Sequence, residues 1–206
     1  MVDVVEPGSA LGAFGAALPT FRSAARLVLE LREVAHSRIV ELGEPRAGPP
    51  LDAMLGTFQI KRLPDVGEIR SAGGSFLLGT GFGRWLLIVE EKATDTARTL
   101  EHVADAFDIA LEAADAWTQF AISGSAALDL LAKGCALDLH PRVFSKDVCA
   151  TTRFAQVRCV LFRATNSHRL LVGRSYAVSL AEWLVEAAEE FGLVHGEQGD
   201  RRSAVE

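Results

Sequence analysis

The sequence carries little positive charge. Lys and Arg number 21 against 27 Asp and Glu, which gives a formal net charge of −6. No segment gathers enough basic residues to offset that balance locally. Proteins that bind nucleic acids usually present a basic face to the phosphates. The composition therefore excludes a nucleic-acid partner from the functions we expect.

Long apolar segments are also missing. Uncharged stretches such as 8–21 and 116–128 are shorter than the roughly 20 apolar residues that a membrane-spanning helix needs. The N-terminal segment Met1–Glu6 is acidic, whereas an export signal begins with a basic region. We therefore expect a cytoplasmic protein without a membrane partner.

Cysteine is scarce, and its spacing fits neither disulfides nor zinc. The chain has three cysteines, Cys135, Cys149 and Cys159, an odd number in a protein long enough to bury a core without cross-links. His140 lies among them, but the four residues lack the closely paired ligands of a structural zinc site. We expect free thiols in a reducing cytosol and no metal bound by this chain.

A globular composition lies between two irregular ends. Hydrophobic residues make up 49% and charged residues 23% of the chain, which is typical of a folded protein. Residues 1–24 are rich in Gly, Ala and Pro and predict an irregular arm, and residues 197–206 predict a frayed polar tail. Between them, 25–106 and 107–196 predict two α+β halves fused into one domain.

Hydrophobic periodicity predicts the elements of each half. Alternation of apolar and polar residues indicates a strand, and apolar residues three or four apart indicate a helix. In the first half we expect strands at 26–33 and 37–42, a short helix at 51–55, a hairpin of strands 75–78 and 84–90, and a helix at 96–106. In the second half we expect strands at 107–113, 117–122 and 169–172, one or two strands within 151–163, and helices at 125–133 and 180–191.

Three local patterns carry more specific predictions. Gly134 is expected to end the helix at 125–133 as a left-handed cap. Ser179 and Glu182 match the capping box of the last helix. In the strand at 107–113, period-two spacing puts every second residue, from Phe107 to Ala113, on one apolar face.

A weak internal repeat connects the two halves. Strand, strand, helix, hairpin and helix follow one another twice, with Leu42-Gly43 before the first short helix and Ser123-Gly124 before the second. The apolar runs Trp85–Ile88 and Arg169–Val172 each precede a longer helix. Two halves, each an antiparallel sheet covered on one face by helices, would produce this pattern.

The glycine-rich segment Gly79–Gly83 is the first candidate for chemistry. A dinucleotide-binding loop needs a strand before it and a helix after it, so that backbone amides and the helix N-terminus meet the phosphates. Here an apolar, strand-like run follows, and the chain has no Lys-Ser or Lys-Thr pair of the P-loop kind. Glycines in a hairpin turn are the better interpretation.

Nucleophilic catalysis is the second candidate. No Gly-x-Ser-x-Gly motif occurs, although such a motif marks the nucleophile of many hydrolases. Cys135 and His140 flank one loop and could serve a small hydrolase, provided that the surroundings stabilise a thiolate. We favour the alternative that Cys135 packs beneath the helix end and His140 hydrogen-bonds a loop carbonyl. We expect no catalytic and no cofactor-binding residue in this chain.

The second half also contains an unusual run, Leu131–Pro141, that reads LAKGCALDLHP. The segments that accompany it are Asp115–Trp117, Ser123-Gly124, Phe144, Cys149–Thr152, Arg174–Ala177 and Glu182–Leu184. Together they resemble the gamma subunit of heterotetrameric sarcosine oxidase over about residues 107–192. The first half is similar to that family in length and in its Gly83–Leu87 run.

The resemblance implies both a fold and a role. The family's fold is similar to the folate-binding domain of the glycine-cleavage aminomethyltransferase. Its complex oxidatively demethylates sarcosine or a related N-methyl amino acid, with transfer of the one-carbon unit to tetrahydrofolate. By this resemblance, FAD, FMN, NAD and zinc belong to other subunits, and this chain would brace the alpha, beta and delta subunits without catalytic residues of its own.

One segment departs from the family, and one alternative stays open. Where the family commonly has Asp-Val-Ser-Asp before the tryptophan, Glu112–Asp115 reads Glu-Ala-Ala-Asp, so contacts with partners are expected to differ there. The alternative is a free-standing tetrahydrofolate-binding protein of the same fold, with Asp115 or Glu112 facing the pterin in a pocket between the halves. If the chain is a subunit of a complex, we expect the apolar residues of the arm at 7–21 to lie against a partner subunit.

Overall fold

The structure, a computed structural model, describes residues 29–34, 37–90, 100 and 103–191. The expected N-terminal arm and polar tail lie outside the described residues. So does most of the helix expected at 96–106, of which residues 100 and 103–106 are described and helical. In the described part, helices combine with antiparallel strands, which confirms the α+β fold class.

The described strands form two five-stranded sheets, and every pairing between strands is antiparallel. We call them sheet one, with the order β3-β4-β5-β2-β6, and sheet two, with the order β1-β7-β10-β9-β8. Their strands are β1 (Glu30–Glu33), β2 (Arg38–Pro45), β3 (Ile69–Ala72), β4 (Ser75–Gly81), β5 (Arg84–Val89), β6 (Phe107–Glu112), β7 (Trp117–Ser123), β8 (Cys149–Phe154), β9 (Val157–Arg163) and β10 (His168–Gly173). The helices are α1 (Pro49–Thr57), α3 (Ala127–Gly134) and α4 (Ala177–Ala188), with 3-10 turns η2 (Ala114–Ala116), η3 (Arg174–Tyr176) and η4 (Glu189–Phe191).

The two sheets repeat one another in strand order. The unit β2-α1-β3-β4-β5 corresponds to β7-α3-β8-β9-β10, and a helix follows each unit. The strand that precedes each unit crosses over, since β1 pairs with β7 in sheet two and β6 pairs with β2 in sheet one. The expected halves 25–106 and 107–196 thus exchange one edge strand each, because each incoming strand pairs with the open edge of the opposite sheet.

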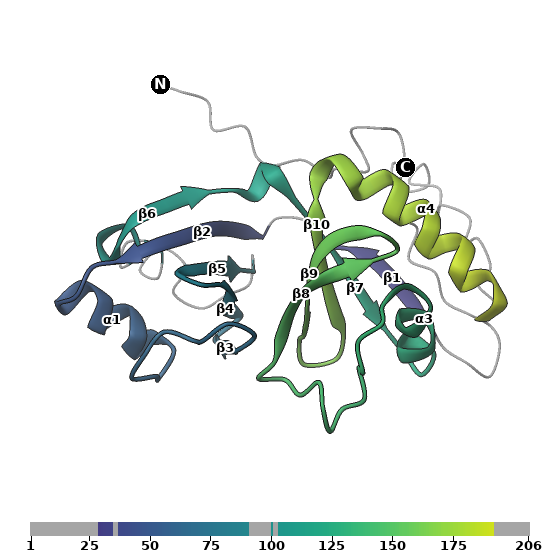
Figure 1. Ribbon diagram of the computed structural model, residues 1–206, viewed down its shortest axis with the longest axis horizontal. Helices are drawn as coiled ribbons and strands as arrows, with labels where there is room; N and C mark the ends of the chain where they lie inside the picture. Colours follow the sequence, from purple (N-terminus) through teal and green to yellow (C-terminus); the bar gives the residue numbers. More distant parts are fainter. Residues whose placement is uncertain (1–28, 35–36, 91–99, 101–102, 192–206) are drawn as a thin grey trace, which may run out of the picture.

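The molecule has four layers, with helices outside and the sheets face to face. Figure 1 shows α1 at one end, α3 and α4 at the other, and both sheets between them. One apolar core joins sheet two to α3 and α4. A second lies between the sheets, and a third joins sheet one to α1 and to residues 103–106.

Side-chain contacts tie the two sheets together. The rings of Phe76 on β4 and Phe162 on β9 lie 5.2 Å apart between centroids, a distance typical of a favourable aromatic pair. Trp117 Nε1 on β7 donates to Glu41 Oε1 on β2 at 2.9 Å. Thr151 Oγ1 donates to the carbonyl of Thr80 at 3.0 Å. The apolar layer and its polar rim therefore join both repeats into one packed body.

Two predictions about helix ends are wrong. Gly134 is the last residue of α3 and is not among the residues with positive φ. A Cβ at Gly134 would lie 2.6 Å from the Phe154 ring, so glycine is needed here for close packing. Ser179 lies inside α4, which begins at Ala177 and has no side-chain cap, because the 3-10 turn η3 leads directly into the helix.

The apolar face expected for β6 is only partly buried. Phe107 and Ala113 are buried at its two ends, but Ile109 and Leu111 are 40% and 59% exposed. Phe107 joins the core under α1, and Ile109 instead lies over Gly43 of β2. The strand prediction is therefore right, while the expectation of a continuous buried face is not.

Candidate functional surface

The glycine segment 79–83 forms a hairpin, as predicted. Gly83 has a φ of 64° in the turn between β4 and β5, a conformation that favours glycine. A Cβ at Gly79 would lie 2.0 Å from the carbonyl oxygen of Asp65, and the amide of Gly79 donates to the carbonyl of Glu68 at 2.9 Å. This glycine therefore lets the Asp65–Glu68 loop lie directly on β4.

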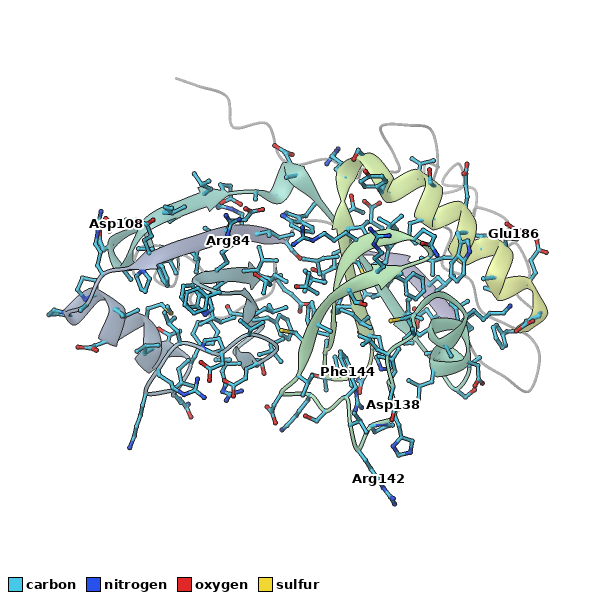
Figure 2. The ribbon with its side chains drawn as sticks, viewed as in Figure 1. Arg84, Asp108, Asp138, Arg142, Phe144 and Glu186 are labelled. Atoms are coloured by element: carbon cyan, nitrogen blue, oxygen red, sulfur yellow. The ribbon has the colours of Figure 1, made fainter. Side chains whose placement is uncertain are left out.

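Cys135 and His140 lie in different surroundings. Cys135 is buried just after α3, and its amide donates to the carbonyl of Leu131 at 3.0 Å. His140 is exposed, and its Nδ1 accepts from the amide of Arg142 at 3.3 Å. The expected bond from His140 to a carbonyl is therefore replaced by this local turn. In Figure 2, Asp138 and Arg142 mark the loop, with Arg142 extending away from both sheets.

The other two cysteines lie in surroundings that disfavour the thiolate form. All three cysteines are free and buried. Burial raises the pKa of Cys149 and of Cys159 to about 12, so both remain protonated thiols at neutral pH. In the part of the chain that the structure describes, no three His, Cys, Asp or Glu side chains cluster as metal ligands would.

The two acidic residues considered for a pterin lie on the surface. Asp115 is exposed in the η2 turn. Glu112, at the end of β6, forms an ion pair with Arg38 and is 43% exposed. Neither residue lines a polar cavity that lies between the two sheets, so the structure does not bring them together as a folate site would require.

This polar cavity is the site that sequence reasoning missed. It measures about 440 Å³ and is bordered by the turns β3–β4 and β9–β10. The charged residues in its lining are Arg32, Glu90 and Arg169. Arg32 and Arg169 meet only because β1 joins sheet two, a long-range pairing that local periodicity does not reveal.

Arg169 is the most unusual side chain of the cavity. It is only 6% exposed, and its Nη2 donates to Glu90 Oε1 at 2.7 Å. Burial lowers its pKa, the Glu90 carboxylate opposes that effect, and the nearby Arg32 guanidinium lowers the pKa further. The contact joins the two sheets, because Arg169 belongs to β10 and Glu90 follows β5.

An exposed apolar surface lies at the opposite edge of sheet one. Leu111 and Ile109 lie opposite Glu41 and Gly43 of β2 and share a face with them, as directly opposed residues of antiparallel strands do. Phe82, at the tip of the neighbouring β4–β5 hairpin, is 99% exposed. Figure 2 shows Arg84 and Asp108 on these same strands. We call Phe82, Ile109 and Leu111 the β6 surface.

Comparison with known proteins gives a consistent result. Residues 61–190, more than half of the chain, match the model of the sarcosine oxidase gamma subunit family. The gamma subunit of sarcosine oxidase from Corynebacterium sp. strain P-1 is 30% identical over 122 residues, which cover 59% of this chain and 60% of that subunit. That alignment thus spans less than two thirds of the relative. The gamma subunit from strain U-96 is 28% identical over 180 residues, covering 85% of this chain and 87% of that subunit.

Solved structures extend the similarity to three dimensions. A chain of the heterotetrameric sarcosine oxidase from Corynebacterium sp. U-96 superposes with a TM-score of 0.71 and 26% identity, covering 85% of this chain and 91% of that one. The glycine cleavage aminomethyltransferase T from Bartonella henselae superposes with a TM-score of 0.52 and 17% identity, covering 76% of this chain and 45% of that one. The latter shows a shared fold, as the resemblance implied. The chain thus belongs to the sarcosine oxidase gamma subunit family.

Proposed function

We propose that this chain is the non-catalytic gamma subunit of a sarcosine-oxidase-type flavoenzyme. The complex would oxidatively demethylate sarcosine or a related N-methyl amino acid and transfer the one-carbon unit to tetrahydrofolate. The observation that carries the proposal is the superposition on a chain of a heterotetrameric sarcosine oxidase along 85% of the sequence. The partners would be alpha, beta and delta subunits, which hold FAD, FMN, NAD and zinc and bind tetrahydrofolate.

The β6 surface supports a bracing role. Ile109, Leu111 and Phe82 are large apolar side chains left open to solvent at one edge of the sandwich. Clusters of exposed apolar residues commonly mark protein–protein contacts. A subunit that contributes shape to a larger assembly needs such a surface, and we place the larger subunits against it.

The surroundings of the cysteines and of His140 also fit a subunit without catalytic residues. Cys149 and Cys159 have raised pKa values, whereas nucleophilic cysteines need lowered ones. His140 uses Nδ1 in its own turn. Free, buried thiols suit the reducing cytosol in which we place the complex.

Co-purification tests the proposal. A tagged chain expressed with the neighbouring reading frames of its source genome should retain a flavin-bearing subunit in fixed stoichiometry, and the assembly should oxidise sarcosine. The full chain expressed alone should be colourless and inactive. Stable flavin absorbance in that isolated chain would overturn the proposal.

Calorimetry separates this proposal from the tetrahydrofolate alternative. The exposed positions of Asp115 and Glu112 give that alternative no specific support. We expect no heat of binding when tetrahydrofolate is titrated into the isolated full chain. Saturable binding at about micromolar concentration, corresponding to roughly −8 kcal/mol, would favour the free-standing folate protein.

A further inference from the structure

Unpaired polar atoms mark one end of the layer between the sheets. Arg169 Nε and Nη1 are buried and have no hydrogen-bond partner within the described residues. Gln119, on β7, is 2% exposed, and its amide nitrogen and oxygen are both unpaired there as well. Buried donors without partners cost about 1–3 kcal/mol each, so nearby negative charge would stabilise the Arg169 guanidinium.

The strand register places two guanidinium groups around a small residue. Arg32 of β1 lies opposite Ala121 of β7, and Ala121 lies opposite Arg169 of β10. The next residue in this row, Phe162, belongs to the core between the sheets. All four side chains therefore share the inner face. Ala121 is short, and both arginines and the Phe76 ring that faces Phe162 line the cavity.

The cavity carries a net positive charge in its lining. Arg32 and Arg169 contribute two positive charges and Glu90 one negative charge, so the sum is 2 − 1 = +1 among the described lining residues. Glu90 occupies only one of the nitrogens of Arg169. A guanidinium has five N–H donors and no acceptor, so Glu90 leaves most of the donors of Arg169 unpaired.

We propose that this cavity is a binding site for a small organic monocarboxylate. One carboxylate balances the net charge of +1 and lies between the guanidinium groups of Arg32 and Arg169. The volume of about 440 Å³ falls in the range of small-molecule sites. The site goes beyond the proposed bracing function, because assembly with partners does not require it.

The rest of the lining favours a carboxylate over phosphate. Ala72, Phe76 and Ala164 supply apolar wall, and Ser71, Asn166 and Ser167 supply neutral polar groups. Phosphate binds such a site with balanced charge only as its monoanion, because the dianion would leave one negative charge uncompensated, and neither form offers a carbon chain to the apolar wall. A carboxylate with a short carbon chain satisfies both the charge and the apolar wall.

Calorimetry with acetate tests the site. The purified full chain is titrated with sodium acetate, with sodium chloride at matched ionic strength as the blank and inorganic phosphate as the competing anion. We expect saturable acetate binding that Arg32→Gln weakens by about tenfold or more. Arg158→Gln, which removes one exposed arginine from β9, should bind acetate as the unmodified chain does.

The outcomes separate this site from the proposed function. Arg169→Gln should also abolish binding, but it leaves Glu90 without its partner, so the exposed Arg32 carries the test if that variant does not fold. The assembled complex should bind acetate with similar affinity. Absence of saturable binding, equal binding by Arg32→Gln, tighter binding of phosphate or loss of the site in the complex would each overturn the proposal. Stoichiometric co-purification would stand in every one of these cases.

Discussion

The exchanged strands β1 and β6 occupy equivalent places and have opposite surroundings. Each lies at the edge of a sheet, with β1 beside β7 in sheet two and β6 beside β2 in sheet one. Leu31 of β1 is 1% exposed and lies in the core under α3 and α4. Leu111 of β6 is 59% exposed. One edge strand thus completes a core, whereas the other leaves its apolar side uncovered.

The faces that the two strands present explain the difference. Leu31 of β1 lies opposite Ile122, and both belong to the helix-side core of sheet two. On β6 the outward charges Asp108 and Glu112 pair with Arg46 and Arg38, and the apolar residues fall on the other side. The repeat therefore keeps the same topology but not the same direction of burial, and the uncovered strand is where we propose that a partner adds apolar contact.

Truncation of one leucine on each strand tests this contrast most strongly. Leu31→Ala should lower the free energy of unfolding by about 2–5 kcal/mol, because it removes buried methyl groups and leaves a cavity. Leu111→Ala should change it by less than about 0.5 kcal/mol, because the side chain is mostly in water. Urea unfolding of both variants measures the difference, and equal losses would contradict the contrast.

Acid should lower the free energy of unfolding through His168, which lies near β1. This residue lies opposite Ile122, which in turn lies opposite Leu31. Burial and the nearby Arg163 lower the pKa of His168 to about 4 from its ordinary value of 6.5. The folded chain therefore keeps His168 neutral, while the unfolded chain binds a proton below pH 6.5. Its contribution to stability is complete above that pH and is lost as the pH falls toward about 4.

Urea unfolding at two pH values isolates this effect. Between about pH 7 and about pH 4.5, we expect His168 to account for a loss on the order of 2 kcal/mol, after allowance for its partial exposure. His168→Gln should reduce the total loss by that amount. A pH dependence that His168→Gln does not alter would contradict the prediction.

Polar substitution on β6 should weaken assembly and leave the fold intact. The double variant Ile109→Ser, Leu111→Ser removes apolar surface worth about 0.8 kcal/mol per buried CH2 group. We expect about a tenfold or greater loss of affinity for the partner subunits, measured by co-purification and by titration of the tagged chain. The urea midpoint of the isolated chain should hardly change.

A matched exposed residue shows whether the effect belongs to β6. Val143, in the loop before β8, is 58% exposed and lies on the second repeat. Val143→Ser should leave assembly unchanged. If it weakens assembly as much as the double variant on β6, the contact surface is not the one that the strand comparison indicates.

The sequence predicts the elements of this fold better than their assembly. The hairpin around 79–83 was predictable because glycines between two apolar runs have a local cause. The exchange of β1 and β6 was not, since an alternating strand pattern does not say which sheet the strand joins. For the same reason the positions of Arg32 and Arg169 on either side of Ala121 could not be predicted.

Close packing accounts for further differences. Gly134 follows a helical stripe, so a left-handed cap was a reasonable prediction, but the Phe154 ring occupies the space of its Cβ. The same holds for Gly79, whose Cβ position is taken by the carbonyl of Asp65. In both cases glycine is required because a residue distant in sequence occupies the Cβ position. No local sequence pattern distinguishes such a glycine from one that is required by a turn.

The ion pairs of β6 should have the smallest effect of all. Glu112→Gln removes the charge that raises the pKa of Arg38 through their hydrogen bond, but both side chains are about half exposed. Exposed pairs contribute about 0–1 kcal/mol and are screened by salt. We expect a loss within that range at low salt and almost none at high salt, measured by urea unfolding. Glu186→Gln, at an exposed position on α4, should show no such salt dependence. A loss as large as that of Leu31→Ala would mean that charge, rather than apolar burial, holds β6 in sheet one.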